Sequence, residues 1–240
     1  MNATKTRKTL GVIGGMGPLA TCLFYQRIIQ RTDALRDQDH IPMIIFSHCT
    51  MPDRTEAILN GREETVYSLL LEDARKLERE GAGAIAIPCN TSHYFADRLQ
   101  DQLSVPIVNM VRETVRAMKE RGARKVGVLG TDGTIQTGLY QKECKDLGLF
   151  SVIPSPETQK AVMYMIYKEI KKGRSGSPVL FAGIDRELRE AGCDGAILAC
   201  TELSCFGAEE RLPEEFYVDA MDVLVERSIE ACGGRLKGGR

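Results

Sequence analysis

The sequence has no tryptophan, and aromatic residues make up only 6% of its 240 residues. A protein that stacks single-stranded bases needs an aromatic platform, so this composition argues against such a binder. The formal net charge is −1, and no long basic or acidic block occurs. We therefore expect neither a nucleic acid nor an anionic membrane surface as a partner.

Long apolar runs are also missing, since no segment approaches the roughly 20 apolar residues of a membrane-spanning helix. Residues 1–9 are polar and basic, and the apolar run after them stops at residues 14–18, too early for a secretory signal. The sequence therefore predicts a cytoplasmic protein with no membrane segment. Its 43% hydrophobic and 27% charged residues are ordinary for a globular chain.

The eight cysteines would suit four disulfides in a small secreted domain, but this chain is long and we expect no secretory signal. Reduced thiols are therefore expected. Four of the cysteines lie in or beside expected helices and strands and are expected to be small apolar residues: Cys22, Cys144, Cys193 and Cys232.

Short apolar runs alternate with longer amphipathic stretches, which indicates parallel βαβ units. Strands are expected at residues 9–14, 42–47, 83–88, 105–109, 125–130, 150–153, 196–199 and 215–219. Helices are expected at 19–32, 63–80, 94–102, 111–121, 135–147, 157–172, 179–191 and 220–231. Residues 48–55 are expected to be a polar loop, and residues 233–240 a disordered tail.

The pattern repeats within the chain. Residues 11–17 (GVIGGMG) match residues 127–133 (GVLGTDG), and a cysteine follows Gly14 by 75 positions and Gly130 by 70. This predicts an α/β protein of two similar three-layer domains with mainly parallel sheets, related by a pseudo-two-fold axis. The first half would comprise residues 1–108 plus 221–240, and the second residues 109–220. The active site would lie in the cleft between them.

Two cysteines stand where buried strands end. Residues 85–88 lead into Cys89, and residues 196–199 lead into Cys200. Ligands bind at the carboxyl edge of a parallel sheet, so both thiols are expected to face one substrate. The amide and hydroxyl groups of Asn90, Thr91, Ser92 and Thr201 adjoin them and can bind a carboxylate or donate to a thiolate. Helix capping is an alternative role for Asn90 and Thr91.

The glycine turn at residues 14–18 would direct backbone N–H groups towards an anion above the first sheet. Residues 15–20 also satisfy the dinucleotide pattern G-x-G-x-x-A. The acidic residue expected at the end of the next strand is missing there, because that strand ends Phe46-Ser47-His48. A plain turn without a ligand is the remaining alternative.

Two other chemistries use cysteine. Cys89 with His93, Cys200 with Cys205, and the adjacent His48-Cys49 could ligate a metal, but none has the paired spacing of a structural zinc site. A cysteine protease needs a thiol with a histidine partner, for which His93 is the candidate. That scheme leaves the second cysteine without a role.

Two opposed thiols fit the inversion of a carbon centre, which needs a base on one face and an acid on the other. A free cysteine has a pKa of about 8.5, so modest tuning gives one thiolate and one thiol. The carbanion between them must be stabilised by donors at the neighbouring carboxylate, because each 1.36 kcal/mol changes the rate about tenfold.

The chain resembles the aspartate/glutamate racemase family, whose members work without pyridoxal phosphate. The resemblance covers nearly the whole length and rests on several motifs in order: residues 14–18 (GGMGP), 51–55 (MPDRT), 88–93 (PCNTSH), 129–134 (LGTDGT), 166–173 (IYKEIKKG) and 200–203 (CTEL).

The resemblance implies Cys89 and Cys200 as the two acid/base residues. It implies α-carboxylate contacts from Asn90, Thr91, Thr201 and the backbone near Met16, and it places the distal carboxylate on Arg54 and Lys171. Residues Ser92, Thr131 and Glu202 of the same motifs complete the expected substrate contacts. Without the resemblance, Arg54 would read as a loop cation and Lys171 as a cation in the last turn of a helix.

The family further implies no cofactor, a homodimer, and a small acidic amino acid as substrate, and the cysteine and histidine spacings predict no metal site. Glutamate racemases carry Asp-Ser-Gly and Cys-Thr-His where this chain has Gly15-Met16-Gly17 and Cys200-Thr201-Glu202, which favours aspartate. Both cysteines are present, so a reversible reaction is expected. A carboxylate at Glu202 should raise the pKa of the Cys200 thiol unless another group intervenes.

Two alternatives remain open. One is a related isomerase or racemase acting on maleate, hydantoins or another α-acid. The other is a binding or sensing protein that kept the cleft without turnover, against which the presence of both cysteines argues.

Overall fold

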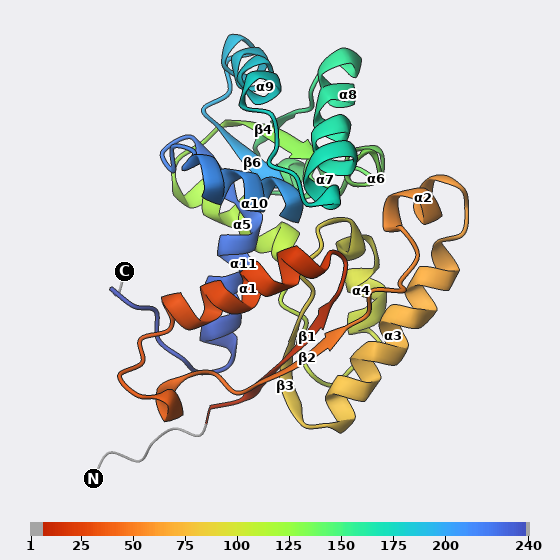
Figure 1. Cartoon of the computed structure of the whole chain (residues 1–240), viewed down its shortest axis with the longest axis vertical. Coiled ribbons are helices and arrows are strands. Elements are labelled where there is room, and N and C mark those ends of the chain that lie inside the picture. The colour runs from red at the N-terminus through yellow and green to blue at the C-terminus, as the bar shows by residue number, and fades with distance from the viewer. Residues whose placement is uncertain (1–6, 239–240) are drawn as a thin grey trace.

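The computed structural model describes residues 7–238, which form two parallel sheets in two lobes (Figure 1). The first sheet has the order β2-β1-β3, with β1 at Thr9–Gly14, β2 at Met43–Ser47 and β3 at Ala82–Ala86. The second has the order β5-β4-β6-β7, with β4 at Lys125–Gly130, β5 at Phe150–Val152, β6 at Gly195–Ala199 and β7 at Tyr217–Asp219. All strand pairs are parallel. The predicted α/β class with parallel sheets is confirmed.

Helices connect the strands. They are α1 (Pro18–Arg31), α2 (Arg54–Leu59), α3 (Glu63–Arg79), α4 (Ala96–Gln100), α5 (Met110–Glu120), α6 (Asp132–Gln136), α7 (Leu139–Asp146), α8 (Pro156–Tyr164), α9 (Pro178–Glu190), α10 (Thr201–Glu210) and α11 (Ala220–Ala231). Three short 3₁₀ segments, η1 (Asp37–Asp39), η2 (Thr91–Phe95) and η4 (Ile170–Lys172), and one π-helical turn, η3 (Met165–Glu169), complete the described elements. None of the helices within residues 7–238 has the length and apolar character needed to cross a bilayer.

Each sheet is covered on both faces. Apolar residues of α3 pack on one face of the first sheet, and those of α8 and α9 on one face of the second. On the opposite faces, α1, α5, α7 and α11 enclose a third cluster that takes buried residues from both sheets. The two lobes therefore share a continuous apolar core behind the cleft. The division at residues 108/109 and 220/221 and the pseudo-two-fold axis stay predictions.

The expected strand at residues 105–109 does not form a ladder. Its backbone makes one parallel bridge, between Ile107 and Ile85, with hydrogen bonds from Ile85 N to Pro106 O and from Val108 N to Ile85 O. Pro106 has no N–H group to donate, which limits pairing at this edge. This prediction of a full strand was wrong.

Two helices were not among those expected from the sequence. Helix α2 begins at Arg54, where the Asp53 carboxylate accepts from the Glu56 N–H at 2.9 Å and caps the first turn. Helix α10 begins at Thr201, directly after Cys200. The expected helix 135–147 is split into α6 and α7 at Gly138, whose φ of 68° is left-handed.

The expected disorder of the tail was wrong for residues 233–238. Asp33 N donates to Arg235 O at 2.8 Å and Lys237 N donates to Arg31 O at 2.8 Å, and Leu236 pairs with Thr32 in an antiparallel bridge. These hydrogen bonds attach the tail to the end of α1. Residues 239 and 240 lie outside the described part of the chain.

Candidate active site

The carboxyl ends of β1, β3, β4 and β6 lead into one small cleft. Ten of the eleven residues expected in the site line it: Met16, Arg54, Cys89, Asn90, Thr91, Thr131, Lys171, Cys200, Thr201 and Glu202. The exception is Ser92, which is fully buried beside the cleft and donates its hydroxyl to Met16 Sδ at 3.6 Å. Three further residues complete the lining: Asp53, Thr55 and Tyr167.

The two thiols reach this cleft from different sheets. Cys89 follows β3 of the first sheet, and Cys200 follows β6 of the second. Their exposed fractions are 6% and 5%, so both are shielded from bulk water. A single cleft thus has one cysteine from each lobe in its wall.

Cys200 donates its thiol hydrogen to Glu202 Oε2 across 2.9 Å, and Glu202 Oε1 pairs with Lys171 Nζ at 3.0 Å. Burial raises the pKa of the Cys200 thiol well above its usual value, and the Glu202 carboxylate raises it further while Lys171 opposes the shift. Burial works against the charge of Lys171, but Glu202 and Cys200 outweigh it, so the pKa of Lys171 is raised. In this arrangement Cys200 holds its proton and Lys171 is charged.

Arg54 is the second cation of the cleft and is 8% exposed. Its guanidinium donates to Pro52 O at 2.9 Å and to Met16 O at 3.2 Å, which fixes it beneath the first glycine turn. Burial opposes its charge, but nearby Cys89 and Asp53 outweigh burial and raise the pKa of Arg54. Its Nε has no protein partner, so the guanidinium keeps donor capacity for a ligand.

Asn90 offers a second unused donor. Its Oδ1 accepts from the buried Tyr140 hydroxyl at 2.5 Å, whereas its Nδ2 has no protein partner. The accepted hydrogen bond sets which end of the amide is the oxygen, so the N–H₂ end is the one left free. A buried donor without a partner in a cleft wall is a natural contact for a carboxylate oxygen.

Threonine hydroxyls join the two lobes at the cleft. Thr131 Oγ1 lies 2.9 Å from Thr55 Oγ1 and 3.0 Å from Thr91 Oγ1. Gly133 allows this close approach, because an added Cβ would lie 2.9 Å from Thr55 Cα and 3.0 Å from Thr91 Cγ2. A side chain at position 133 would therefore push the lobes apart.

Tyr167 and Lys171 come from a distorted stretch of chain. Helix α8 widens into the π turn η3 and then tightens into η4, which carries Lys171. The Tyr167 hydroxyl donates to Asp53 Oδ1 and Oδ2 at 3.1 and 3.0 Å. Asp53, Thr55 and Tyr167 were not among the residues expected in the site from the sequence. Their closeness in the sequence to Arg54 and Lys171 was the signal that could have found them, because Asp53 and Thr55 flank Arg54 and Tyr167 precedes Lys171 by four positions.

His93 does not act on the thiol. Its Nδ1 lies 2.9 Å from the backbone oxygen of Cys89, and its Nε2 accepts from Met110 N at 3.1 Å. Burial lowers the pKa of His93, so the ring is neutral and joins two backbone segments. The cysteine–histidine pair considered from the sequence is not formed. No three His, Cys, Asp or Glu side chains within residues 7–238 are grouped so that they could hold a metal ion.

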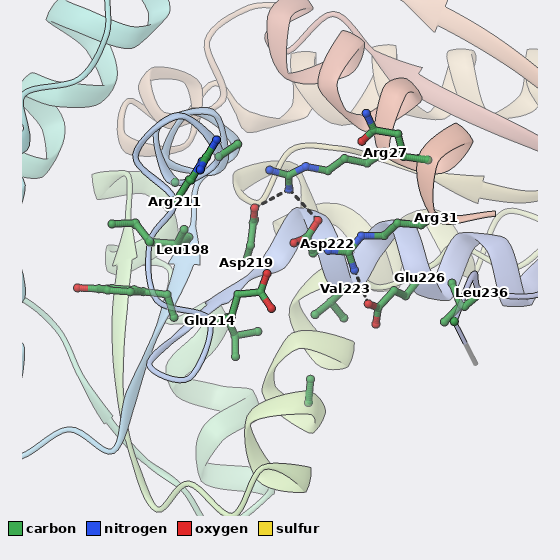
Figure 2. Close-up of a pocket in the computed structure, with 18 of the residues that line it drawn as sticks. Arg27, Arg31, Leu198, Arg211, Glu214, Asp219, Asp222, Val223, Glu226 and Leu236 are labelled. Carbon is green, nitrogen blue, oxygen red and sulfur yellow. Dashed lines mark hydrogen bonds and ion pairs between the residues drawn. The ribbon is translucent and has the colours of Figure 1, made fainter. Parts of the chain in front are cut away.

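A larger groove of about 860 Å³ lies beside α1, α10 and α11 (Figure 2). Five of its charged side chains form ion pairs: Arg27 contacts Asp219 at 2.6 Å and Asp222 at 2.9 Å, and Arg31 contacts Glu226 at 2.5 Å. No cysteine lines it. The small cleft, which two cysteines line, is therefore the candidate active site, and the paired charges of the groove link α1 to the start of α11.

The sequence profile of the family described as Asp/Glu/Hydantoin racemase matches residues 13–227. The chain belongs to this family. The match covers most of the 240 residues, so both lobes and the whole cleft are part of the family's racemase fold.

Individual members of the racemase family agree with this assignment. The broad specificity amino-acid racemase RacX of Bacillus subtilis is 33% identical over 201 residues, which are 81% of this chain and 86% of that protein. The Picrophilus torridus aspartate racemase structure is 28% identical with a TM-score of 0.80, over 96% of each chain. A Corynebacterium diphtheriae glutamate racemase is 33% identical over 141 residues, which are 57% of this chain and 51% of that protein.

Proposed function

We propose that this racemase interconverts the L and D forms of an acidic amino acid, aspartate above all, by two-base proton transfer without a cofactor. One thiolate removes the Cα proton from one face, and the opposite thiol donates a proton to the other. Cys200 holds its proton in the described arrangement, so it would act first as the acid and Cys89 as the base. For the opposite enantiomer the two cysteines exchange roles.

The observation that carries this proposal is that Cys89 and Cys200, from different sheets, line one buried cleft with the cations Arg54 and Lys171. An acidic substrate needs cationic partners for its carboxylates. The free Asn90 Nδ2 and the hydroxyls of the cleft would stabilise charge that moves from Cα onto the α-carboxylate.

Racemisation of L-aspartate in D₂O tests the mechanism. Each D-aspartate molecule formed should carry deuterium at Cα, because the proton removed by one thiol is not the one supplied by the other. D-aspartate that retains protium in a large fraction would contradict a two-thiol transfer.

A broader substrate range is the second candidate, favoured by the similarity to the broad specificity racemase RacX over 81% of this chain. A polarimetric screen of the L-amino acids separates the two candidates. Arg54→Lys keeps the charge but loses the fork that binds a carboxylate through two N–H groups. It should lower activity on aspartate more than activity on alanine if Arg54 holds the distal carboxylate.

A further inference from the structure

Glu202 bridges a cation and a thiol inside the candidate active site. One carboxylate oxygen pairs with Lys171 Nζ at 3.0 Å, and the other accepts from Cys200 Sγ at 2.9 Å. Glu202 is 6% exposed, and an added Cβ on Gly17 would lie 3.6 Å from its Oε1. Its carboxylate is therefore held directly under the first glycine turn.

This ion pair changes the charge that the cleft offers to a ligand. Lys171 and Arg54 are the two cations that line it, and Glu202 neutralises the first of them. The other acid of the lining, Asp53, is engaged by the Tyr167 hydroxyl. An incoming carboxylate thus meets Arg54, which keeps an unpaired N–H donor, and Lys171, which already pairs with Glu202.

The small volume of the cleft limits how a ligand carboxylate can reach Lys171. With Glu202 in place the cleft has a volume of about 20 Å³, roughly the room that one water molecule needs. A ligand carboxylate that reaches the Lys171 ammonium must displace Glu202 or share the cation with a like charge. Either event weakens the binding of that carboxylate. Displacement breaks the Lys171–Glu202 ion pair, and sharing brings two like charges to close range in a buried site, where they repel.

We propose that Glu202 is a specificity-determining residue, an internal carboxylate that competes with the substrate's distal carboxylate for Lys171. An amino acid with an uncharged side chain leaves the Lys171–Glu202 pair intact, whereas aspartate must displace Glu202. The enzyme therefore discriminates less between acidic and uncharged amino acids than a cleft with two free cations would. This inference rests on the proposed function, which places the substrate in this cleft.

Equilibrium binding of two four-carbon acids tests the competition without turnover. Succinate has a distal carboxylate and butyrate does not, and calorimetry gives the Kd of each. Glu202→Gln should bind succinate about tenfold tighter than the wild-type protein, with butyrate changed by less than about twofold; tenfold corresponds to the loss of one moderate repulsion. Glu210→Gln, an exposed position on the same helix α10, is the matched control and should bind both acids as the wild type does.

Several outcomes would overturn the inference. The inference fails if succinate binds to Glu202→Gln no tighter than to the wild type, or if both acids gain affinity equally. If Glu202→Gln does not fold, Glu202→Asp serves in its place, since its shorter side chain reaches Lys171 less well. Unchanged succinate binding in Glu202→Asp would then contradict the competition. Because binding needs no chemistry, these results are separate from the proposed function, which fails instead if the wild-type protein neither binds the acids nor racemises amino acids.

Discussion

The Tyr140 hydroxyl donates to Asn90 Oδ1 across 2.5 Å, and neither residue is more than 2% exposed. Tyr140 lies on α7 of the second lobe, and Asn90 follows Cys89 in the first. Burial raises the pKa of Tyr140, so the hydroxyl keeps its hydrogen and remains a donor. One hydrogen bond between the lobes therefore orients the amide whose Nδ2 has no protein partner.

Tyr140→Phe should weaken substrate binding without removing either thiol. Loss of the donor leaves Asn90 Oδ1 buried and unpaired, which should cost about 1–3 kcal/mol of unfolding free energy. The freed amide can turn its oxygen towards the substrate carboxylate, so KM should rise more than kcat falls. Steady-state kinetics and urea unfolding measure both effects. A fall in kcat with KM unchanged would argue against an orienting role for Tyr140.

Cys89→Ala and Cys200→Ala should each lower racemisation by about 10²–10⁴-fold or more, the usual contribution of a positioned acid or base. Polarimetry gives the rates, and circular dichroism should show a retained fold because either change removes a single small atom. Cys22→Ala, at an exposed position on α1, is the control and should keep wild-type activity. Wild-type activity in either cleft variant would remove that cysteine from the mechanism.

The Lys171–Glu202 pair should show strong coupling in stability. Lys171→Met leaves the Glu202 carboxylate buried without its cation, which should cost about 2 kcal/mol of unfolding free energy. The value is below that of a fully buried pair because the Lys171 side chain is 23% exposed. The double variant Lys171→Met/Glu202→Gln should regain most of that loss. Urea unfolding of the four proteins gives the coupling, and additive effects of the two changes would contradict it.

Stability should depend on pH through Asp222 of the charge network in Figure 2. Burial and then Asp219 raise the pKa of Asp222 to about 6, against the opposing effects of Arg27 and Arg31. A carboxyl group whose pKa is higher in the folded protein binds its proton more tightly there, so its contribution to stability falls as the pH rises.

The expected window runs from pH about 4, where an unfolded aspartate titrates, to pH about 6. Over that window the unfolding free energy of the wild type relative to Asp222→Asn should fall by up to about 3 kcal/mol. Urea titrations at several pH values measure the difference. Parallel stability curves for the two proteins would show that Asp222 does not titrate in this way.

Much of the site could be predicted because its residues follow strand ends. Cys89 and Cys200 each come directly after a buried apolar run, and parallel strands direct such positions to the same edge of a sheet. Ser92 illustrates the limit of this reasoning. It is adjacent to Thr91, yet the 3₁₀ turn η2 points its hydroxyl at Met16 Sδ instead of into the cleft.

The helices around the cleft were harder to predict. Asp53 and Glu56 have the spacing of a helix start, but α2 is only six residues long, so its periodic signal is weak. Helix α10 is buried on several sides, and a helix without a polar face does not show a clear period. The widening of α8 into a π turn before Lys171 has no local signature in the sequence.

Local pattern was sufficient for the parallel α/β class, the two glycine turns and the twin cysteines, whereas Arg54 and Lys171 were assigned through the family resemblance. These features depend on residues a few positions apart, whose spacing is visible in the chain. The contact of Tyr140 with Asn90 and the contact of Glu202 with Lys171 were decided by the tertiary structure. Each joins side chains that are far apart in the sequence, and their distances follow from packing that no stretch of sequence contains by itself.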